Sequence, residues 1–396
     1  MIGGTGTVCV RLAPMTPMLP AREFGTLRLA DVMPGCLSAV LGETNALGLP
    51  PVSKAVVLLV DGLGAHNLRA RQGHARFLSA RMGKKNVIDG VFPATTVAGI
   101  GSLTTGVSPG EHGLVGYRVL DPDGDRVVNQ LTGWDDGMVP EDWQRATTVF
   151  ERATDAGIPS FAIGPRRFAA TGFTRAVLRG AQYVPAEKLA DRFAAAADVL
   201  ATESRALVYV YVPELDIAAH ARGWESAKWL AELESLDSEV ARFAAALKPD
   251  EGLLVTADHG VLDVPRDKHV LFDTVPELVA GVRHIGGDPR CLHLYLEPGA
   301  GKAATAALAE AWRAVEGERA WVMTRDEAIA VGLFGAVLSD VVPRIGDVVV
   351  SARKLIAYYD SREADQSAQS MIGQHGALTD EELRVPLVRA GAFELR

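Results

Sequence analysis

Cysteine is scarce in this chain of 396 residues. The three cysteines, Cys9, Cys36 and Cys291, are odd in number and follow no CxxC spacing. A disulfide framework and a thiolate zinc site are therefore both disfavoured, because each needs several cysteines at suitable spacings. We expect each cysteine to be a small buried apolar residue.

Positive charge is also in short supply, since 40 Lys and Arg stand against 49 Asp and Glu and the formal net charge is -9. No cluster of Lys and Arg is interleaved with aromatic residues. This balance argues against a nucleic-acid partner bound through its backbone phosphates. A small phosphorylated substrate stays compatible with the acidic average, because bound divalent cations make a pocket locally positive.

Long apolar runs are missing as well. The longest near a motif, AVVLLV at 55–60, is far shorter than the ~20 residues of a membrane span. The N-terminal stretch is interrupted by Arg11, Pro14, Pro17 and Pro20, and it lacks the pattern of a secretory signal. We therefore expect no membrane partner and a cytoplasmic enzyme, with unusual export routes left open.

Hydrophobic residues make up 48% of the chain, which is enough to bury a large core. Short aliphatic runs at 56–60, 158–163, 207–212 and 253–256 are typical of strands buried on both faces of a parallel sheet. Helical patterns lie between them at 147–156, 185–202 and 226–247. This alternation predicts a mostly parallel central sheet flanked by helices.

Three units are expected along the chain. Residues 1–45, rich in Pro and Gly, are predicted to wrap the surface. Residues 46–263 and 372–396 would form the catalytic α/β core. Between these two parts, residues 264–371 read as a small inserted α+β cap, with strand-like pieces at 291–296, 321–323 and 347–350 around a helix at 302–315.

Acidic and histidine residues follow the predicted strands and recur over more than three hundred positions. They lie in VVLLVDGLG, YVPELDIAAH, LLVTADHG and IGQHG, and they are Asp61, Asp216, His220, Asp258, His259 and His375. In an open parallel sheet, sites form outside the carboxyl ends of the strands. Carboxylates and imidazoles without thiolates fit zinc, manganese or iron at a hydrolytic site, and these three Asp and three His would make two metal sites if they converge.

A nucleophile is expected from FPATT, where a strand ending near Phe92 turns into a helix starting about Thr96. Thr95 or Thr96 could bridge the two ions. Free backbone N–H groups and the positive end of the helix dipole favour an alkoxide and a phosphoryl group at this position.

Together, VDGLG, FPATT with TTGVSPGEHGLVGY, PELDIAAHARG, TADHG and GQHG resemble, in order and spacing, the alkaline phosphatase superfamily. Within it they look most like the nucleotide pyrophosphatase/phosphodiesterase branch, the type I phosphodiesterases. The resemblance runs from about Val56 to Gly376. It implies an alkaline-phosphatase-like sandwich with an inserted cap, and hydrolysis of phosphodiester or phosphoanhydride bonds.

The resemblance also implies roles for single residues. The nucleophile falls on Thr96, which would form a covalent phosphothreonine. One zinc site is implied from Asp61, Thr96, Asp258 and His259, and the other from Asp216, His220 and His375.

Two departures from the family pattern concern the substrate. Tyr117 stands where the family has an Asn that holds a phosphate oxygen. Its phenol can donate one hydrogen bond from farther along the side chain, so Tyr117 is a candidate catalytic residue and its replacement of the Asn stays open. Val97 replaces an aromatic residue that stacks on a nucleotide base in many members, and nucleotide specificity therefore stays open.

Alternatives remain at this stage. The same site could serve a phosphomonoesterase or a phosphonate hydrolase, or a metal-binding homologue with impaired catalysis. A strand-end Asp can also be a simple helix cap. The sequence does not determine the natural substrate or the oligomeric state.

Overall fold

A six-stranded sheet forms the centre of the larger part of the molecule. The computed structural model describes residues 27–394. The sheet has the order β18-β8-β1-β7-β5-β6, and only the edge strand β18 runs antiparallel to its neighbour. Its strands are β1 (Lys54–Val60), β5 (Ser160–Gly164), β6 (Gln182–Pro185), β7 (Ala206–Val212), β8 (Glu251–Thr256) and β18 (Val388–Gly391). The predicted mostly parallel sheet is confirmed.

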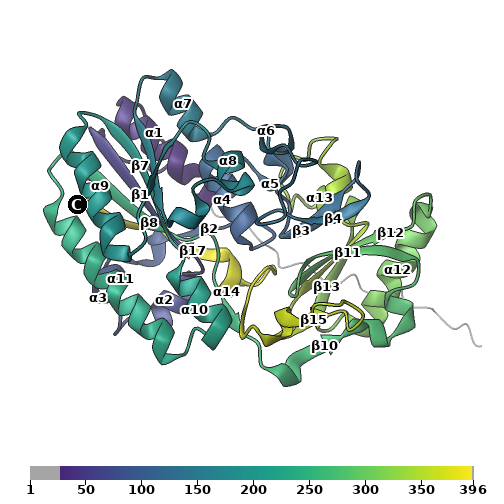
Figure 1. Cartoon of the computed structure of the whole chain (residues 1–396). Coiled ribbons are helices and arrows are strands. Elements are labelled where there is room, and N and C mark those ends of the chain that lie inside the picture. Colours follow the sequence, from purple (N-terminus) through teal and green to yellow (C-terminus); the bar gives the residue numbers. More distant parts are fainter. Residues whose placement is uncertain (1–26, 395–396) are drawn as a thin grey trace, which may run out of the picture.

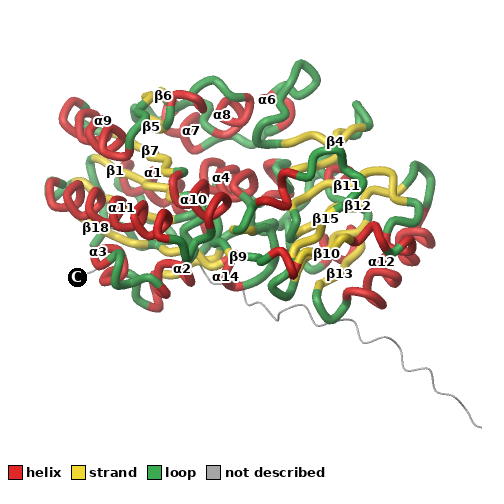
Figure 2. The backbone as a smooth tube through the Cα atoms, turned by 60° about the horizontal axis from the view of Figure 1, so that its bottom comes forward, coloured by secondary structure: helices red, strands yellow, loops and turns green. Residues whose placement is uncertain are grey.

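Helices cover both faces of this sheet, which explains why β1 and β8 are buried along their whole length. The helices α9 (Leu189–Thr202) and α11 (Ala227–Ala246) pack on one face, where they lie side by side at the left of Figure 2. On the other face lie α1 (Val32–Leu41), α4 (Thr96–Thr105) and α7 (Val149–Asp155). The helix predicted at 226–247 begins after Ser226, whose hydroxyl accepts a hydrogen bond from the Trp229 N–H.

The described part of the predicted surface-wrapping segment behaves differently from expectation. Residues 1–26 lie outside the described residues, but α1 packs on the main sheet with most of its side chains buried, Cys36 among them. Its apolar sequence VMPGCLSAVL explains this position. The expectation of a surface wrap is therefore wrong for this helix. Cys36 and Cys291 are both free, buried thiols, and Cys9 lies outside the described residues.

A second, antiparallel sheet stands beside the main one, at the right of Figure 1. Its order is β11-β12-β14-β13, with bounds Val282–Asp288, Cys291–Leu296, Val348–Ala352 and Ala320–Thr324, and the helix α12 (Gly301–Glu316) packs against it. All of these elements lie within residues 264–371. The division of the chain into a core and an inserted cap stays a prediction, and we call residues 264–371 the inserted unit.

Short elements connect the two sheets. The strand expected to end near Phe92 ends at Asp89 and pairs outside the main sheet with β17. The two-stranded pairs are β2 (Val87–Asp89) with β17 (Arg384–Pro386), β3 (Arg118–Asp121) with β4 (Arg126–Asn129), β9 (Leu262–Asp263) with β16 (Gly373–Gln374), and β10 (His269–Leu271) with β15 (Ala357–Tyr359). The remaining α-helices are α2 (Ala65–Ala70), α3 (Arg76–Arg81), α5 (Pro109–His112), α6 (Pro140–Trp143), α8 (Gly172–Val177), α10 (Glu214–Arg222), α13 (Arg325–Ala330) and α14 (Asp380–Leu383). Among the described residues, no helix is both long and apolar enough to cross a membrane.

Candidate metal centre and active site

The first ligand group forms at the carboxyl ends of β1 and β8, as the sequence predicts. Asp61, Asp258 and His259 are buried and bring their ligand atoms within 4.8 Å of one another. The His259 Nε2 lies 3.4 Å from an Asp61 oxygen and 3.7 Å from an Asp258 oxygen. These three residues and Thr96 are called the first group below.

Backbone turns after the two strands hold this group in shape. Asp258 Oδ1 accepts hydrogen bonds from the backbone N–H groups of Gly62 and His259, at 3.1 and 3.0 Å. Gly62 has φ 73° and packs so closely on Asp216 that an added Cβ would lie 3.2 Å from it. A glycine therefore permits both the turn and the close approach of the Asp216 segment.

The two threonines of FPATT have separate roles. Thr95 is the N-cap of α4, and its hydroxyl accepts a hydrogen bond from the Ala98 N–H. Thr96 is the first residue of the helix, and its Oγ1 lies 3.2 Å from His259 Nε2 and 3.5 Å from Asp61 Oδ1. The geometry thus places the hydroxyl of Thr96, and not that of Thr95, against the first group.

The second group comes from α10 and from the segment after β16. Asp216 and His220 share one face of α10, and His220 Nε2 lies 3.3 Å from Asp216 Oδ2. His375 Nε2 lies 3.9 Å from Asp216 Oδ1. The rings of His259 and His375 stack with centroids 3.7 Å apart, so the two groups are contiguous. All six predicted Asp and His ligands therefore converge.

Each histidine is oriented by a backbone carbonyl. The Nδ1 atoms of His220, His375 and His259 lie 2.8, 2.8 and 3.1 Å from the carbonyl oxygens of Gly373, Ala94 and Gly260. A carbonyl can only accept, so each Nδ1 donates and each Nε2 is directed toward the carboxylates. This is the arrangement that metal-binding histidines adopt.

The charges of the site fit divalent cations. Burial raises the pKa of Asp61 well above its usual value, and the neighbouring charges of Asp258 and Asp216 raise it further. One oxygen of Asp216 and one of Asp258 are buried without a hydrogen-bond partner among the described residues. Buried carboxylates that repel each other and leave oxygens unpaired need a positive partner, and a metal ion supplies one.

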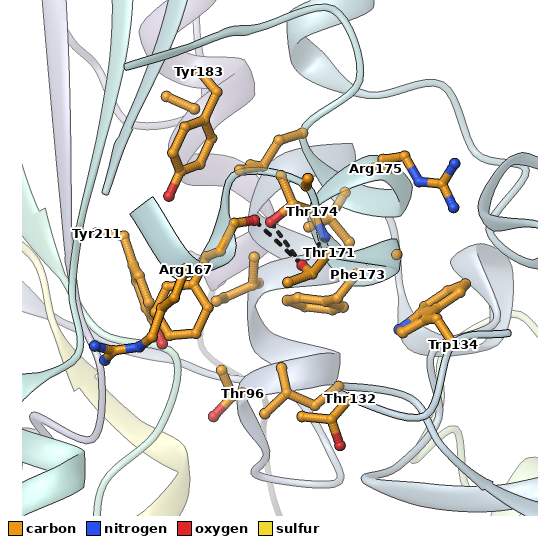
Figure 3. A pocket seen from close by; sticks show the side chains of 18 of the residues that line it. Thr96, Thr132, Trp134, Arg167, Thr171, Phe173, Thr174, Arg175, Tyr183 and Tyr211 are labelled. Atoms are coloured by element: carbon orange, nitrogen blue, oxygen red, sulfur yellow. Dashed lines mark hydrogen bonds between the residues drawn. The ribbon is translucent and has the colours of Figure 1, made fainter. Parts of the chain in front are cut away.

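Thr96 also lines two separate cavities. The first, of about 630 Å³, has mostly apolar and aromatic walls from β5, β7, α8 and the loop before α6. Figure 3 shows Thr96 beneath the ring of Phe173, with Tyr211 and Trp134 on opposite sides and Arg167 at the edge. Its other aromatic walls are Phe168, Tyr183 and Tyr209. We call it the aromatic cavity.

The second cavity, of about 490 Å³, opens between the second group and the inserted unit, and we call it the polar cleft. Its wall includes the predicted ligands Asp216, His220 and His375 together with Thr96. Tyr117 lines the polar cleft too, although its ring packs partly against the main core. Its other polar lining includes Arg118, Asn129, Asp288, Asp360, Glu363 and Gln374.

Sequence reasoning missed several residues of the site. The Tyr211 hydroxyl donates to Asp61 Oδ2 at 2.5 Å and also faces the aromatic cavity. Its signal was available, because Tyr211 lies near the end of a predicted strand directly before the Asp216 motif. Val97 is fully buried and lines neither cavity. Trp229, which follows the His220 motif in the sequence, is also buried in the core and lines neither cavity. The aromatic side chains near Thr96 come instead from segments far away in the sequence.

The fold places the chain in a structural class with the following two solved proteins. Murine ectonucleotide pyrophosphatase/phosphodiesterase 5 has a similar fold, with a TM-score of 0.66 at 18% identity over 85% of this chain and 88% of that one. Phosphonoacetate hydrolase from Sinorhizobium meliloti 1021, in complex with phosphonoformate, gives a TM-score of 0.65 at 19% identity over 86% and 91%.

Sequence comparison narrows this class to a family. The model of the family "Type I phosphodiesterase / nucleotide pyrophosphatase" matches residues 55–378, and the chain therefore belongs to that family. A phosphopentomutase from Anaeromyxobacter sp. (strain K) is 31% identical over 145 residues, which are 36% of this chain and 35% of that protein. The chain thus matches only about a third of the length of this relative.

Proposed function

We propose that this protein hydrolyses phosphodiester or phosphoanhydride bonds, with Thr96 as nucleophile and a covalent phosphothreonine as intermediate. One observation carries the proposal: Thr96 lines both the aromatic cavity and the polar cleft. A phosphorus atom bonded to its hydroxyl would have room for an organic group on each side. A diester or an anhydride of two larger groups uses both spaces.

The residues around Thr96 support nucleophilic attack. As the first residue of the ten-residue helix α4, Thr96 lies beside free backbone N–H groups and the positive end of the helix dipole. These groups favour both the alkoxide and the negative phosphoryl oxygens. The aromatic cavity would hold one substituent and exclude water from it.

Two divalent cations would be held by the two groups. Asp61, Thr96, Asp258 and His259 would bind one, and Asp216, His220 and His375 the other. Oxygen and nitrogen donors without sulfur favour zinc, with manganese and iron as alternatives. When bound, such ions stabilise negative charge on the attacking and leaving oxygens.

A phosphomonoesterase fits the polar side of the site less well. A monoester carries additional charge on terminal oxygens, which needs unpaired cationic groups. Arg118 in the polar cleft is paired with Glu363 at 2.8 Å, and Arg167 at the aromatic cavity lies 3.6 Å from Glu187. Among the arginines of the described lining, Arg175 at the aromatic cavity has no ion pair, and a terminal phosphate would therefore find one unpaired guanidinium beyond the two proposed ions.

The similar structures suggest candidate substrates. An inactive variant of murine ectonucleotide pyrophosphatase/phosphodiesterase 5 is in complex with AMP, at a TM-score of 0.66 and 17% identity. A small nucleotide-like diester with its base in the aromatic cavity is our first candidate. Phosphonate hydrolysis is the second, since a phosphonoacetate hydrolase shares the fold. Cytoplasmic localisation remains a prediction.

The test compares bis(p-nitrophenyl) phosphate, p-nitrophenyl phosphate and phosphonoacetate as substrates. We expect the diester to be preferred, chelation to abolish its turnover and zinc to restore it. Thr96→Ala should remove at least about a thousandfold in kcat, as loss of a covalent nucleophile does. Thr104→Val is a matched control in the same helix, because the Thr104 hydroxyl bonds only backbone carbonyls of α4. Full activity of Thr96→Ala would contradict the proposal.

A further inference from the structure

The polar cleft contains a neutral side chain, Asn129, whose amide donors have no partner among the described residues. Asn129 ends β4, and the β3–β4 hairpin sets it directly opposite Arg118. The next residue, Gln130, donates its backbone N–H to the carbonyl of Tyr117 at 2.8 Å. Asn129 therefore belongs to the same cleft wall as Tyr117, and this wall also includes Thr96.

The amide of Asn129 is oriented by the turn that follows it. Its Oδ1 accepts hydrogen bonds from the backbone N–H groups of Leu131 and Thr132, at 2.9 and 3.1 Å. Only an amide oxygen can accept both bonds, so the Nδ2 group is on the other side. Within residues 27–394, no hydrogen bond from Nδ2 to another group is seen, and the residue is half-buried.

An oriented amide with two free N–H groups suits a phosphoryl oxygen. The negative charge of the transferring group is spread over its non-bridging oxygens, and fixed donors aimed at them lower the barrier. The family pattern expects an Asn for this task at position 117, where this chain has Tyr117. The Tyr117 ring packs partly against the main hydrophobic core, although the residue also lines the polar cleft.

Resting on the proposed function, we infer that Asn129 is a catalytic residue that donates from Nδ2 to a non-bridging oxygen of the phosphoryl group on Thr96. The hairpin thereby supplies, from the end of β4, the amide that the family pattern places at position 117 just before β3. A purely structural Asn129 would only hold the turn at 131–132 through its Oδ1. The two roles use different atoms of one side chain and can be separated.

Two variants separate them. Asn129→Asp keeps an oxygen for the Leu131 and Thr132 N–H groups, removes both donors and adds a negative charge, whereas Asn129→Ala removes the whole amide without adding charge. We expect both to lower kcat for a diester by about 10²–10³, the loss typical of one oxyanion donor. Thermal unfolding and zinc content should stay as in the wild type for Asn129→Asp. If the role is structural, Asn129→Asp stays active, and the inference is overturned.

A sulfur substitution tests the contact itself. The two diastereomers of thymidine 5′-p-nitrophenyl phosphorothioate place a weakly accepting sulfur at one or the other non-bridging position. In the wild type, the isomer that points sulfur at Asn129 should react more slowly relative to the oxygen substrate. In Asn129→Ala, the ratio of the rate with the oxygen substrate to the rate with that isomer should shrink. The same ratio for the other isomer should stay constant. Equal changes for both isomers, or the same loss on Tyr117→Phe instead, would overturn the inference.

A control and a decision rule complete the experiment. Asn45→Ala removes an asparagine with a similar local role, bonding both backbone groups of Leu49 far along the chain from the site, and should leave turnover unchanged. A wild type that turns over no diester overturns the proposed function and this inference together. An active wild type, an inactive Thr96→Ala and a fully active Asn129→Ala overturn this inference alone.

Discussion

The two ligand groups differ in how they are buried and in what holds them. The side chains of Asp61, Asp258 and His259 are at most 4% exposed. Those of Asp216, His220 and His375 are 13, 24 and 10% exposed. The first group is built on the ends of two central strands, whereas the second joins a helix to a segment that returns from the inserted unit.

That returning segment is fixed by a fully buried ion pair. Arg290, in the turn between β11 and β12, binds both carboxylate oxygens of Glu382 at 2.9 and 2.8 Å. Glu382 also accepts from the Ala377 N–H at 2.9 Å, two residues after His375. Its own carbonyl accepts from the Gly260 N–H at 2.8 Å, next to His259. One residue thus anchors segments of both groups.

The comparison shows that one half of the site is made by the main sheet and the other half by its contact with the inserted unit. The yellow segment between the two sheets in Figure 1, around α14, is where this contact is made. Damage to the first group should therefore affect chemistry directly. Damage to the contact should act first on the second group.

The largest effect is expected from Asp258→Asn. The variant loses a ligand charge of the first group, so kcat/KM for the diester should fall by at least about a thousandfold. Because burial raises the pKa of Asp258 and the neighbouring carboxylates repel one another, the chelated variant should be more stable than the chelated wild type. Activity assays and zinc content check the expected fall in kcat/KM, and thermal unfolding in chelator checks the expected rise in stability. Unchanged zinc content would contradict the assignment.

Glu382→Gln should separate the two groups, because the Glu382 side chain holds the Ala377 N–H beside the second group, whereas the Glu382 backbone carbonyl, which holds Gly260 beside the first group, is unchanged. The substitution leaves the Arg290 charge buried without its partner, which costs about 3–5 kcal/mol in the free energy of unfolding. If the proposed function holds, the affinity for one of the two proposed metal ions should fall by about 10–100-fold, as for other residues that orient ligands. Zinc titration and urea unfolding measure these changes. Lys302→Met, which breaks an exposed ion pair with Asp326 in the same unit, is the matched control with no effect. Equal weakening of both ions would argue against the division into groups.

Tyr211→Phe should have a smaller effect confined to the first group. The variant removes the hydrogen bond to Asp61 and keeps the ring that lines the aromatic cavity. We expect kcat to fall about tenfold with little change in KM, because the ligand is less well oriented while the cavity is intact. A rise in KM alone would mean that the hydroxyl serves substrate binding instead.

The smallest effect concerns the helix that carries Thr96. Buried His112 bonds Ser102 of α4, and burial lowers its pKa from 6.5 to about 3. The folded state therefore stays neutral where the unfolded chain takes up a proton, and stability is lost as pH falls from 6.5 toward 3. His112→Gln should reduce this slope by about 1 kcal/mol per pH unit. Urea unfolding at pH 7.5 and pH 5 checks it, and an identical slope would contradict the assignment.

Much of the fold and the convergence of the six Asp and His residues could be predicted because the signals were local. Buried strands are short aliphatic runs, and a ligand placed directly after such a run must lie at the sheet edge. Asp61, Asp258 and Asp216 follow this rule. The helix α1 was missed because Pro and Gly in the surrounding segment masked its apolar face.

The remaining features depend on contacts between distant segments. Nothing near Asn129 marks it as part of the cleft, since its position is set by the pairing of β3 with β4 and by the packing of that hairpin on β11. The Arg290–Glu382 pair joins residues 92 positions apart. The aromatic cavity likewise draws on β5, β7 and α8, so no single motif contains it.

The position of Thr96 between two cavities has a kinetic consequence if the proposed function holds. The group that leaves first departs through the polar cleft, while the other half of the substrate stays in the aromatic cavity on the threonine. The products would then be released in a fixed order. A small alcohol that enters the emptied cleft could replace water as the acceptor, so that the protein would also transfer its bound group from one ester to another.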